Sequence, residues 1–199
     1  MDRERFPILA EYLEGLPDGL ESYPDCESKS SLILSALDGH DRALIADGLP
    51  DALAAVVREP PPPGVWMPAV MNDAVFFAVC DRYYPTPEAV HAWTYDRTLA
   101  MTKNPLYRTL LRVPGPRVLL RMAARTHGLL QRGTMLAAKS SDSNVHLTLT
   151  FPPKLHVGLN LVSNVALWQV VVEVTGGKNV KSRLDRVTDT EAHYVVDFD

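Results

Sequence analysis

The chain has 199 residues, 46% of them apolar, and a formal net charge of −4. This length and composition suit a folded domain with a sizeable core, and they argue against a disordered or disulfide-stapled chain. Its two cysteines, Cys26 and Cys80, follow no metal-binding or disulfide pattern. No stretch reaches the roughly 18 apolar residues of a membrane span, and no apolar leader is visible, so a cytoplasmic protein is expected.

The first 60 residues are predicted to form short helices, because apolar side chains recur at helical spacing from Phe6 to Leu13. Four prolines at 60–63, followed by Gly64, end any helix there and predict a stiff polyproline connector. We favour a connector over a ligand for an SH3-type domain, because the basic anchor of such ligands is absent.

The middle of the chain is predicted to be helical as well. Residues 66–84 form the most apolar stretch and should be a central helix, since apolar side chains cover more than one face. Residues 87–102 begin with Pro87 and Glu88, which favour a helix start. A short helix near 107–111 and a longer one over 117–132 should follow.

The pattern then changes to strands. Residues 134–139 and 145–151 are strand-like and joined by a turn-rich linker, and a long apolar helix is predicted from Leu155 to about Val172. Two more strands are expected at 180–187 and 193–198. The sequence therefore predicts an α+β fold, in which hairpin, helix and hairpin form a four-stranded antiparallel sheet packed on helices.

We expect a single α+β domain over residues 1–199. Within it, residues 1–64 would be an N-terminal helical segment with the proline-rich connector, and residues 65–199 would be a sensor-like core. No internal repeat at a fixed period is visible.

Charge is distributed unevenly along the chain. Between Arg97 and Ser141 there are nine basic residues and no acidic one, whereas residues 1–96 carry 17 acidic and six basic ones. Several of these arginines recur four residues apart and share helix faces. We call the following set the arginine face: Arg108, Arg112, Arg117, Arg121, Arg125 and Arg132. Either it docks an acidic partner or anionic surface, or the acidic N-terminal residues cover it. Nucleic acid is not expected, because no DNA-binding motif is present and the net charge is negative.

Three segments carry a resemblance to known sensor modules. They are Val113–Arg121 with the sequence VPGPRVLLR, the hairpin 134–151, and the ending Glu191–Asp199. With the order of helices, they resemble the haem nitric oxide/oxygen-binding domains and the vinyl-reductase-type small-ligand domains. The chain is also similar to a paralogous family of uncharacterised myxobacterial proteins of similar length.

The resemblance implies a cofactor question. In haem-binding members a histidine near the end of the helix before the sheet ligates iron, and His127 falls at about that place. Those members hold the haem propionates with a Tyr-x-Ser-x-Arg pattern, which residues 151–155 lack. Vinyl-reductase-type domains often carry cysteines in the last hairpin, but residues 194–198 contain none. We therefore expect no metal site and no cofactor, with haem bound through His127 as the alternative.

Aromatic residues suggest a ligand pocket between the helices and the sheet. The candidate lining residues are Phe76, Phe77, Trp93, Tyr95, His127 and Trp168. For any one of these residues, a place in an aromatic core that fills the same space is the favoured explanation.

No motif of an enzyme is present, so no catalytic activity is expected. The predicted function is a regulatory or sensor-like domain without haem, which binds a small apolar ligand or a partner protein. The first alternative is a haem-based gas sensor with His127 as axial ligand. The second is a protein-interaction module that docks an acidic partner through the arginine face.

Overall fold

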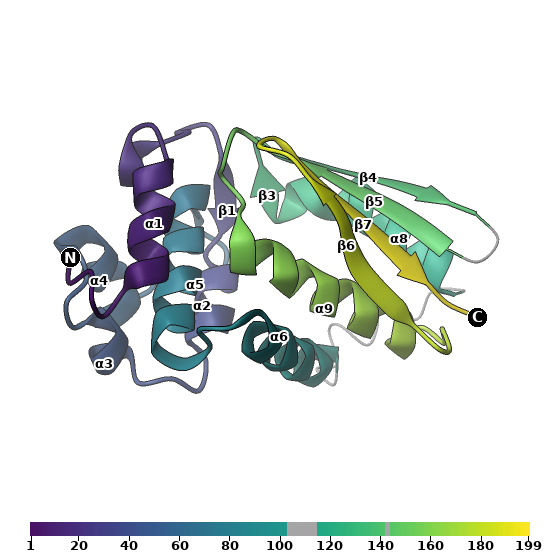
Figure 1. Ribbon diagram of the computed structural model, residues 1–199, viewed down its shortest axis with the longest axis horizontal. Helices are drawn as coiled ribbons and strands as arrows, with labels where there is room; N and C mark the ends of the chain where they lie inside the picture. Colours follow the sequence, from purple (N-terminus) through teal and green to yellow (C-terminus); the bar gives the residue numbers. More distant parts are fainter. Residues whose placement is uncertain (103–114, 142–143) are drawn as a thin grey trace.

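The computed structural model describes residues 1–102, 115–141 and 144–199. Figure 1 shows a helical part at the N-terminal end of an elongated molecule and a four-stranded sheet at the other end, with helix α9 between them. The short helix expected near 107–111 lies outside the described residues.

Six α-helices form the helical part. They are α1 (Pro7–Gly15), α2 (Ser31–Leu37), α3 (Arg42–Ala46), α4 (Asp51–Arg58), α5 (Ala69–Tyr83) and α6 (Pro87–Thr102). A 3₁₀ turn, Gly19–Glu21, follows α1. Helix α5 is central, as its apolar sequence predicts, because it is buried on almost every side between Ala69 and Cys80.

A small three-stranded sheet joins the helical part to the rest of the chain. Its strands are β1 (Glu27–Lys29), β2 (Trp66–Pro68) and β3 (Gln131–Arg132), in the order β2-β1-β3 and all antiparallel. Gly133 follows β3 with a φ of +74°, and a Cβ there would lie 2.5 Å from the Cys26 sulfur. Only glycine fits this crossing without displacement.

The expected helix over 66–84 is wrong in its first turn for a physical reason. Residues before a proline favour extended backbone, so Trp66 and Met67 pair with β1 and the helix starts only after Pro68. The expected helix over 117–132 is also too long. Helix α8 ends at Thr126, a 3₁₀ turn covers His127–Leu129, and the chain then enters β3.

The predicted four-stranded antiparallel sheet is confirmed. It consists of β4 (Met135–Ser140), β5 (Asn144–Thr150), β6 (Lys181–Val187) and β7 (Glu191–Asp197), in the order β4-β5-β7-β6. Along β5 the buried residues Val145, Leu147 and Leu149 alternate with more exposed ones, which places one face of the sheet on the core.

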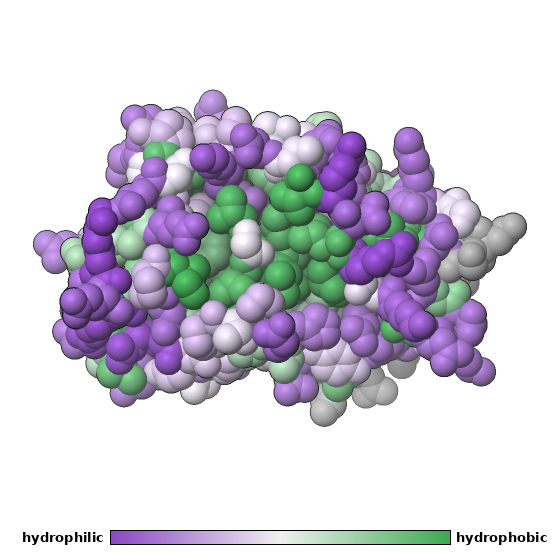
Figure 2. All heavy atoms as spheres, in the orientation of Figure 1, coloured by the Kyte–Doolittle hydropathy of each residue, from purple (hydrophilic) through white to green (hydrophobic). Residues whose placement is uncertain are grey.

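Helix α9 (Gly158–Val174) covers this face and packs against β6, β7 and α6, while α8 (Pro116–Thr126) lies against β4 and α9. The apolar side chains of α9 itself are distributed around the whole helix and not confined to one face. Figure 2 accordingly shows a continuous hydrophobic area over this helix, bordered by hydrophilic side chains. No helix among the described residues is both long and apolar enough to cross a membrane.

One buried cluster runs through both parts of the molecule, from Phe6 in the first helix region to Phe198 after the last strand. At its centre the Tyr12 ring packs on Phe77 with centroids 4.7 Å apart, and the Tyr12 hydroxyl donates to the Leu155 carbonyl at 3.1 Å. Helical part and sheet therefore share a core.

A carboxylate from α5 caps the start of α1. The Oδ atoms of Asp81 accept hydrogen bonds from the backbone N–H groups of Ile8 and Leu9 at 2.9 and 3.0 Å. Burial raises the pKa of Asp81, although these two hydrogen bonds work in the opposite direction. The cap satisfies donors that would otherwise be unpaired at this helix end.

Replacing this cap should destabilise the fold. We expect Asp81→Ala to lower the free energy of unfolding by about 1–2 kcal/mol, because two partly buried N–H groups lose their acceptor. Urea unfolding followed by circular dichroism measures this. Asp185→Ala, which removes an exposed carboxylate on β6, serves as the control and should stay within about 0.5 kcal/mol of the parent. Equal effects of the two substitutions would contradict the assignment of the cap.

Candidate functional site

A buried polar cluster lies where α5 meets the start of α9. The Nδ1 atom of His156 is 2.7 Å from Oδ2 of Asp73, and Nδ2 of Asn160 donates to Oδ1 of the same carboxylate at 2.9 Å. The side chains of His156 and Asp73 are only 3% and 2% exposed. Burial, and then the charge of Asp73, raise the pKa of the neighbouring Tyr12 hydroxyl, which therefore stays protonated.

The second ring nitrogen of His156 has no partner. Its Nε2 is buried and makes no hydrogen bond to any described residue. A carboxylate oxygen accepts from the Nδ1–H of the ring, so Nε2 is the ring nitrogen left for another group. Histidines that bind metals are oriented by carboxylates in the same way.

His127 lies close to this cluster, in the 3₁₀ turn that follows α8. Its Nε2 is 2.8 Å from the Thr134 hydroxyl oxygen. Burial lowers the pKa of His127 below its usual value, and the nearby His156 lowers it further. At neutral pH the imidazole of His127 is therefore uncharged. The structure thus brings a histidine selected from the sequence next to one that was not.

A signal for the second histidine was present in the sequence. Asp73 is the one acidic residue in the first three turns of the most apolar predicted helix. A carboxylate in such a place needs a buried partner. His156, between Leu155 and Val157 at the start of the other apolar helix, is a fitting candidate.

The other predicted pocket residues do not converge on one site. Phe77 packs on Tyr12 in the core, and Phe76 stacks on Trp93 with centroids 5.7 Å apart. The Tyr95 hydroxyl donates to Glu173 of α9 at 2.6 Å. Trp168 is buried in α9, and its Nε1 has no partner among the described residues. Of the predicted set, only Trp93 lines the cavity described next.

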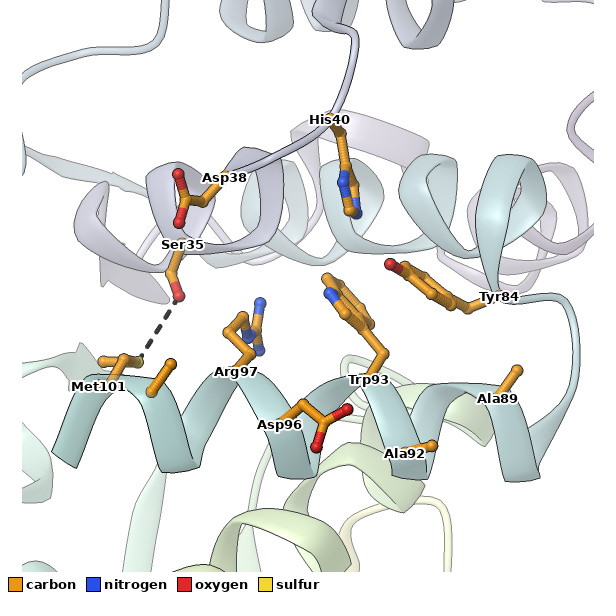
Figure 3. Close-up of a pocket in the computed structure, with 11 residues that line it drawn as sticks. Ser35, Asp38, His40, Tyr84, Ala89, Ala92, Trp93, Asp96, Arg97 and Met101 are labelled. Carbon is orange, nitrogen blue, oxygen red and sulfur yellow. Dashed lines mark hydrogen bonds between the residues drawn. The ribbon is translucent and has the colours of Figure 1, made fainter. Parts of the chain in front are cut away.

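A cavity of about 760 Å³ opens between α2 and α6, within the helical part and not between helices and sheet (Figure 3). The residues that line it are Ser35, Asp38, His40, Tyr84, Ala89, Ala92, Trp93, Asp96, Arg97, Ala100 and Met101. The rings of Tyr84 and Trp93 are stacked with centroids 4.5 Å apart, and the Arg97 guanidinium lies over the Trp93 ring at 4.5 Å.

The arginine face is described for four of its six members, since Arg108 and Arg112 fall outside the described residues. Arg132 forms an ion pair with Glu27 at 3.2 Å and lies over the Trp66 ring. For Arg117, Arg121 and Arg125 on α8, the described part of the chain provides no ion pair. The acidic N-terminal region therefore covers the end of this face at Arg132, and no described acidic residue pairs with the α8 arginines.

Two other acidic N-terminal residues form ion pairs within the first 60 residues. Asp47 pairs with Arg5 at 2.8 Å, and Glu14 pairs with Arg3. The described residues contain no cluster of three or more histidine, cysteine, aspartate or glutamate side chains placed to hold a metal ion.

Comparison with solved structures identifies the architecture. A structure determined to explain H-NOX activation superimposes with a TM-score of 0.59 at 8% identity, covering 86% of this chain and 96% of that one. An oxygen-binding H-NOX domain related to soluble guanylate cyclases gives a TM-score of 0.57 at 10% identity, covering 84% and 91%. A structure on the modulation of haem redox potential by porphyrin distortion gives 0.59 at 10%, covering 85% and 97%.

The chain therefore has the fold of H-NOX domains, as the resemblance implied. No protein-family model matches it, and no curated protein sequence matches it. Because only 8–10% of the residues are identical, these superpositions establish the fold and no more specific property of this chain.

The prediction that the domain takes no cofactor is wrong in the light of these neighbours. The solved structures that share the architecture are H-NOX domains, among them one described by its oxygen complex and one by its haem redox potential. Haem is therefore the cofactor to which the fold points. The missing Tyr-x-Ser-x-Arg pattern, on which the expectation rests, concerns the haem propionates and not the imidazoles of His127 and His156.

The lowered pKa of His127 makes a prediction for stability. The unfolded chain binds a proton at His127 near pH 6.5, and the folded chain does so only at lower pH. The contribution of this residue is therefore complete above about pH 6.5 and is lost progressively as the pH falls from there through the lower pKa of the folded state. His127→Gln should flatten the fall in unfolding free energy between about pH 7.5 and 5.5 in urea titrations. The exposed His146→Gln is the control, and an equal flattening there would contradict the assignment.

The lack of ion pairs along α8 makes a second prediction. We expect Arg121→Glu to change the free energy of unfolding by no more than about 0.5 kcal/mol, because within the described part of the chain this exposed side chain donates only to the Arg117 carbonyl on its own helix. Thermal unfolding followed by circular dichroism tests it. Loss of folding would show that the arginine belongs to an internal ion-pair network, and the docking hypothesis would then fail.

Proposed function

We propose that this chain is a haem-binding sensor domain whose haem site lies at the junction of α5, α8 and α9. The observation that carries the proposal is the buried, unpartnered Nε2 of His156, held by Asp73 beside the uncharged imidazole of His127. The H-NOX fold supports it, because neighbours with this fold include an oxygen-binding domain.

The donor set at the junction suits an iron porphyrin. Haem iron in proteins is commonly held by a neutral imidazole nitrogen, and its properties are tuned by the groups that orient this ligand. His127 would hold the iron, in the position that the resemblance assigns to the ligand, after giving up its contact with Thr134. His156 would face the same site with a nitrogen whose orientation Asp73 and Asn160 fix.

The propionates would need a partner other than the Tyr-x-Ser-x-Arg pattern. In the corresponding stretch, Phe151 and Leu155 are buried. Lys154 is exposed, and its backbone has a left-handed conformation with a φ of +60°. Lys154 is the cation that this stretch offers to a propionate.

When bound, haem would supply an iron coordination position for a diatomic gas. The chain itself would turn occupancy into a change of packing. Asp73 belongs to α5, and His156 and Asn160 belong to the segment that begins α9, so a group that competes for His156 loosens the link between the two helices. Because α9 covers the sheet, a looser link between α5 and α9 would let the sheet change its position relative to the helical part. We propose no catalytic step.

A second candidate function is favoured by a separate observation. Arg117, Arg121 and Arg125 have no ion pair in the described residues, so an acidic partner protein could receive the signal on this face of α8. Both cysteines are buried free thiols, which agrees with the cytoplasmic location that we propose.

The haem proposal is tested by an absorption spectrum of the full chain expressed with a haem precursor. We expect a Soret band at near-equal haem and protein concentrations. His127→Ala should weaken haem binding about tenfold or more, and added imidazole should restore the band, because the missing ligand is an imidazole. His156→Ala should retain haem but move the band.

The matched control is His146→Ala, which removes an exposed histidine from β5 and should leave the spectrum unchanged. A colourless parent protein that also fails to bind haem in titrations would contradict the proposal. Haem retained unchanged by His127→Ala would leave haem binding in place but would refute His127 as the ligand.

A further inference from the structure

The cavity between α2 and α6 has the features of a second ligand site, distinct from the proposed haem site around His127 and His156. In Figure 3 the side chain of Arg97 rises from α6 toward α2, and His40 points toward Trp93 from the chain after α2, with Tyr84 beside it. Its volume of about 760 Å³ is within the range of small-molecule sites.

Two nitrogen atoms of the lining are buried without a partner. Nε of Arg97 and Nε2 of His40 make no hydrogen bond to any described residue. Buried polar groups are normally satisfied, so two such atoms around one cavity indicate a missing acceptor or ligand.

Among the described residues, the guanidinium of Arg97 also has no ion-pair partner. Burial lowers its pKa, yet an arginine stays protonated at neutral pH, so this side chain keeps its positive charge. No carboxylate of the described residues forms an ion pair with it, and the sequence from 103 to 114 contains no acidic residue. A desolvated cation of this kind is stabilised by an anion that enters the cavity.

The walls beside this cation are aromatic. Trp93 and Tyr84 are parallel to within 11°, and the His40 ring centroid lies 5.8 Å from that of Trp93 and 5.6 Å from that of Tyr84. Arg97 is held in place by its position over Trp93. A flat apolar group next to the anionic one would therefore find stacking partners.

Two exposed carboxylates, Asp38 and Asp96, also line the cavity. Because they are solvated, they are screened more strongly than Arg97 is, but they still repel additional negative charge. The cavity is therefore suited to a single negative charge and disfavours a polyphosphate.

We propose that this cavity binds an aromatic monocarboxylate, with Arg97 and His40 facing the carboxylate and the Trp93 and Tyr84 rings contacting the flat body. This site is independent of the proposed haem function, because its lining contains none of His127, His156 and Asp73.

Calorimetric titration of the full chain with 2-naphthoate tests the proposal, with the uncharged 2-naphthamide as the matched ligand. We expect 2-naphthoate to bind at least about tenfold more tightly, and Arg97→Met to remove this preference. Arg58→Met, which removes an exposed arginine at the end of α4, should leave binding unchanged. Asp38→Asn should tighten binding about two- to threefold.

Location is tested by fluorescence. 2-Naphthoate should quench tryptophan emission in the parent and lose most of this quenching in Trp93→Phe. If Arg97→Met does not fold, the preference of the parent for 2-naphthoate over 2-naphthamide and the Trp93→Phe result decide the question. Equal binding of the two compounds, no binding of either, or full affinity in folded Arg97→Met would overturn the proposal, whether or not the protein binds haem.

Discussion

The buried carboxylate of Asp73 is the constraint on which the arrangement of the molecule depends. It lies in the most apolar helix of the chain, where an unpaired charge would cost several kcal/mol. Its two partners, His156 and Asn160, belong to the segment that begins α9. The hydrogen bonds of Asp73 therefore form only when the start of α9 lies against α5. Because α9 covers the sheet, the same contact positions the sheet. The Tyr12 contact with Leu155 fastens the first helix to the same segment.

The two candidate sites of this molecule depend on different physics. Where α5, α8 and α9 meet, the uncharged imidazole of His127 lies close to the buried His156 in a low-dielectric interior, an environment that suits a metal ion held in an apolar cofactor. In the cavity of the helical part, a guanidinium keeps its charge at the edge of the solvent beside stacked rings, which suits an anion. Neither site needs the other, because the residues that line the cavity include none of His127, His156 and Asp73. One fold thus offers two places where a ligand would change helix packing.

Much of the fold followed from pattern. The period-two alternation of β5 and the apolar length of α9 are local signals, and both elements lie where the sequence placed them. The small sheet is not predicted, because its strands have two or three residues and pair across 37 to 105 positions, and periodicity does not detect such pairs. The same limit applied to the sites. His127 was found through a resemblance, but its neighbour His156 is 29 positions away, and Arg97 was counted only as one charge among nine. What distinguishes His156 and Arg97 is a buried nitrogen without a hydrogen-bond partner among the described residues, and this is a property of the folded chain.

The small sheet also bears on how the chain is synthesised. Strand β1 lies in the middle of the order β2-β1-β3, so one of its edges is completed by residues 66–68 and the other by residues 131–132. On the ribosome the helical part is already exposed when the second edge is still missing. For the time needed to translate about 65 residues, β1 presents an open row of backbone donors and acceptors. Its shortness, and the charged Glu27 and Lys29 at its ends, protect the nascent chain from pairing with another copy during this interval.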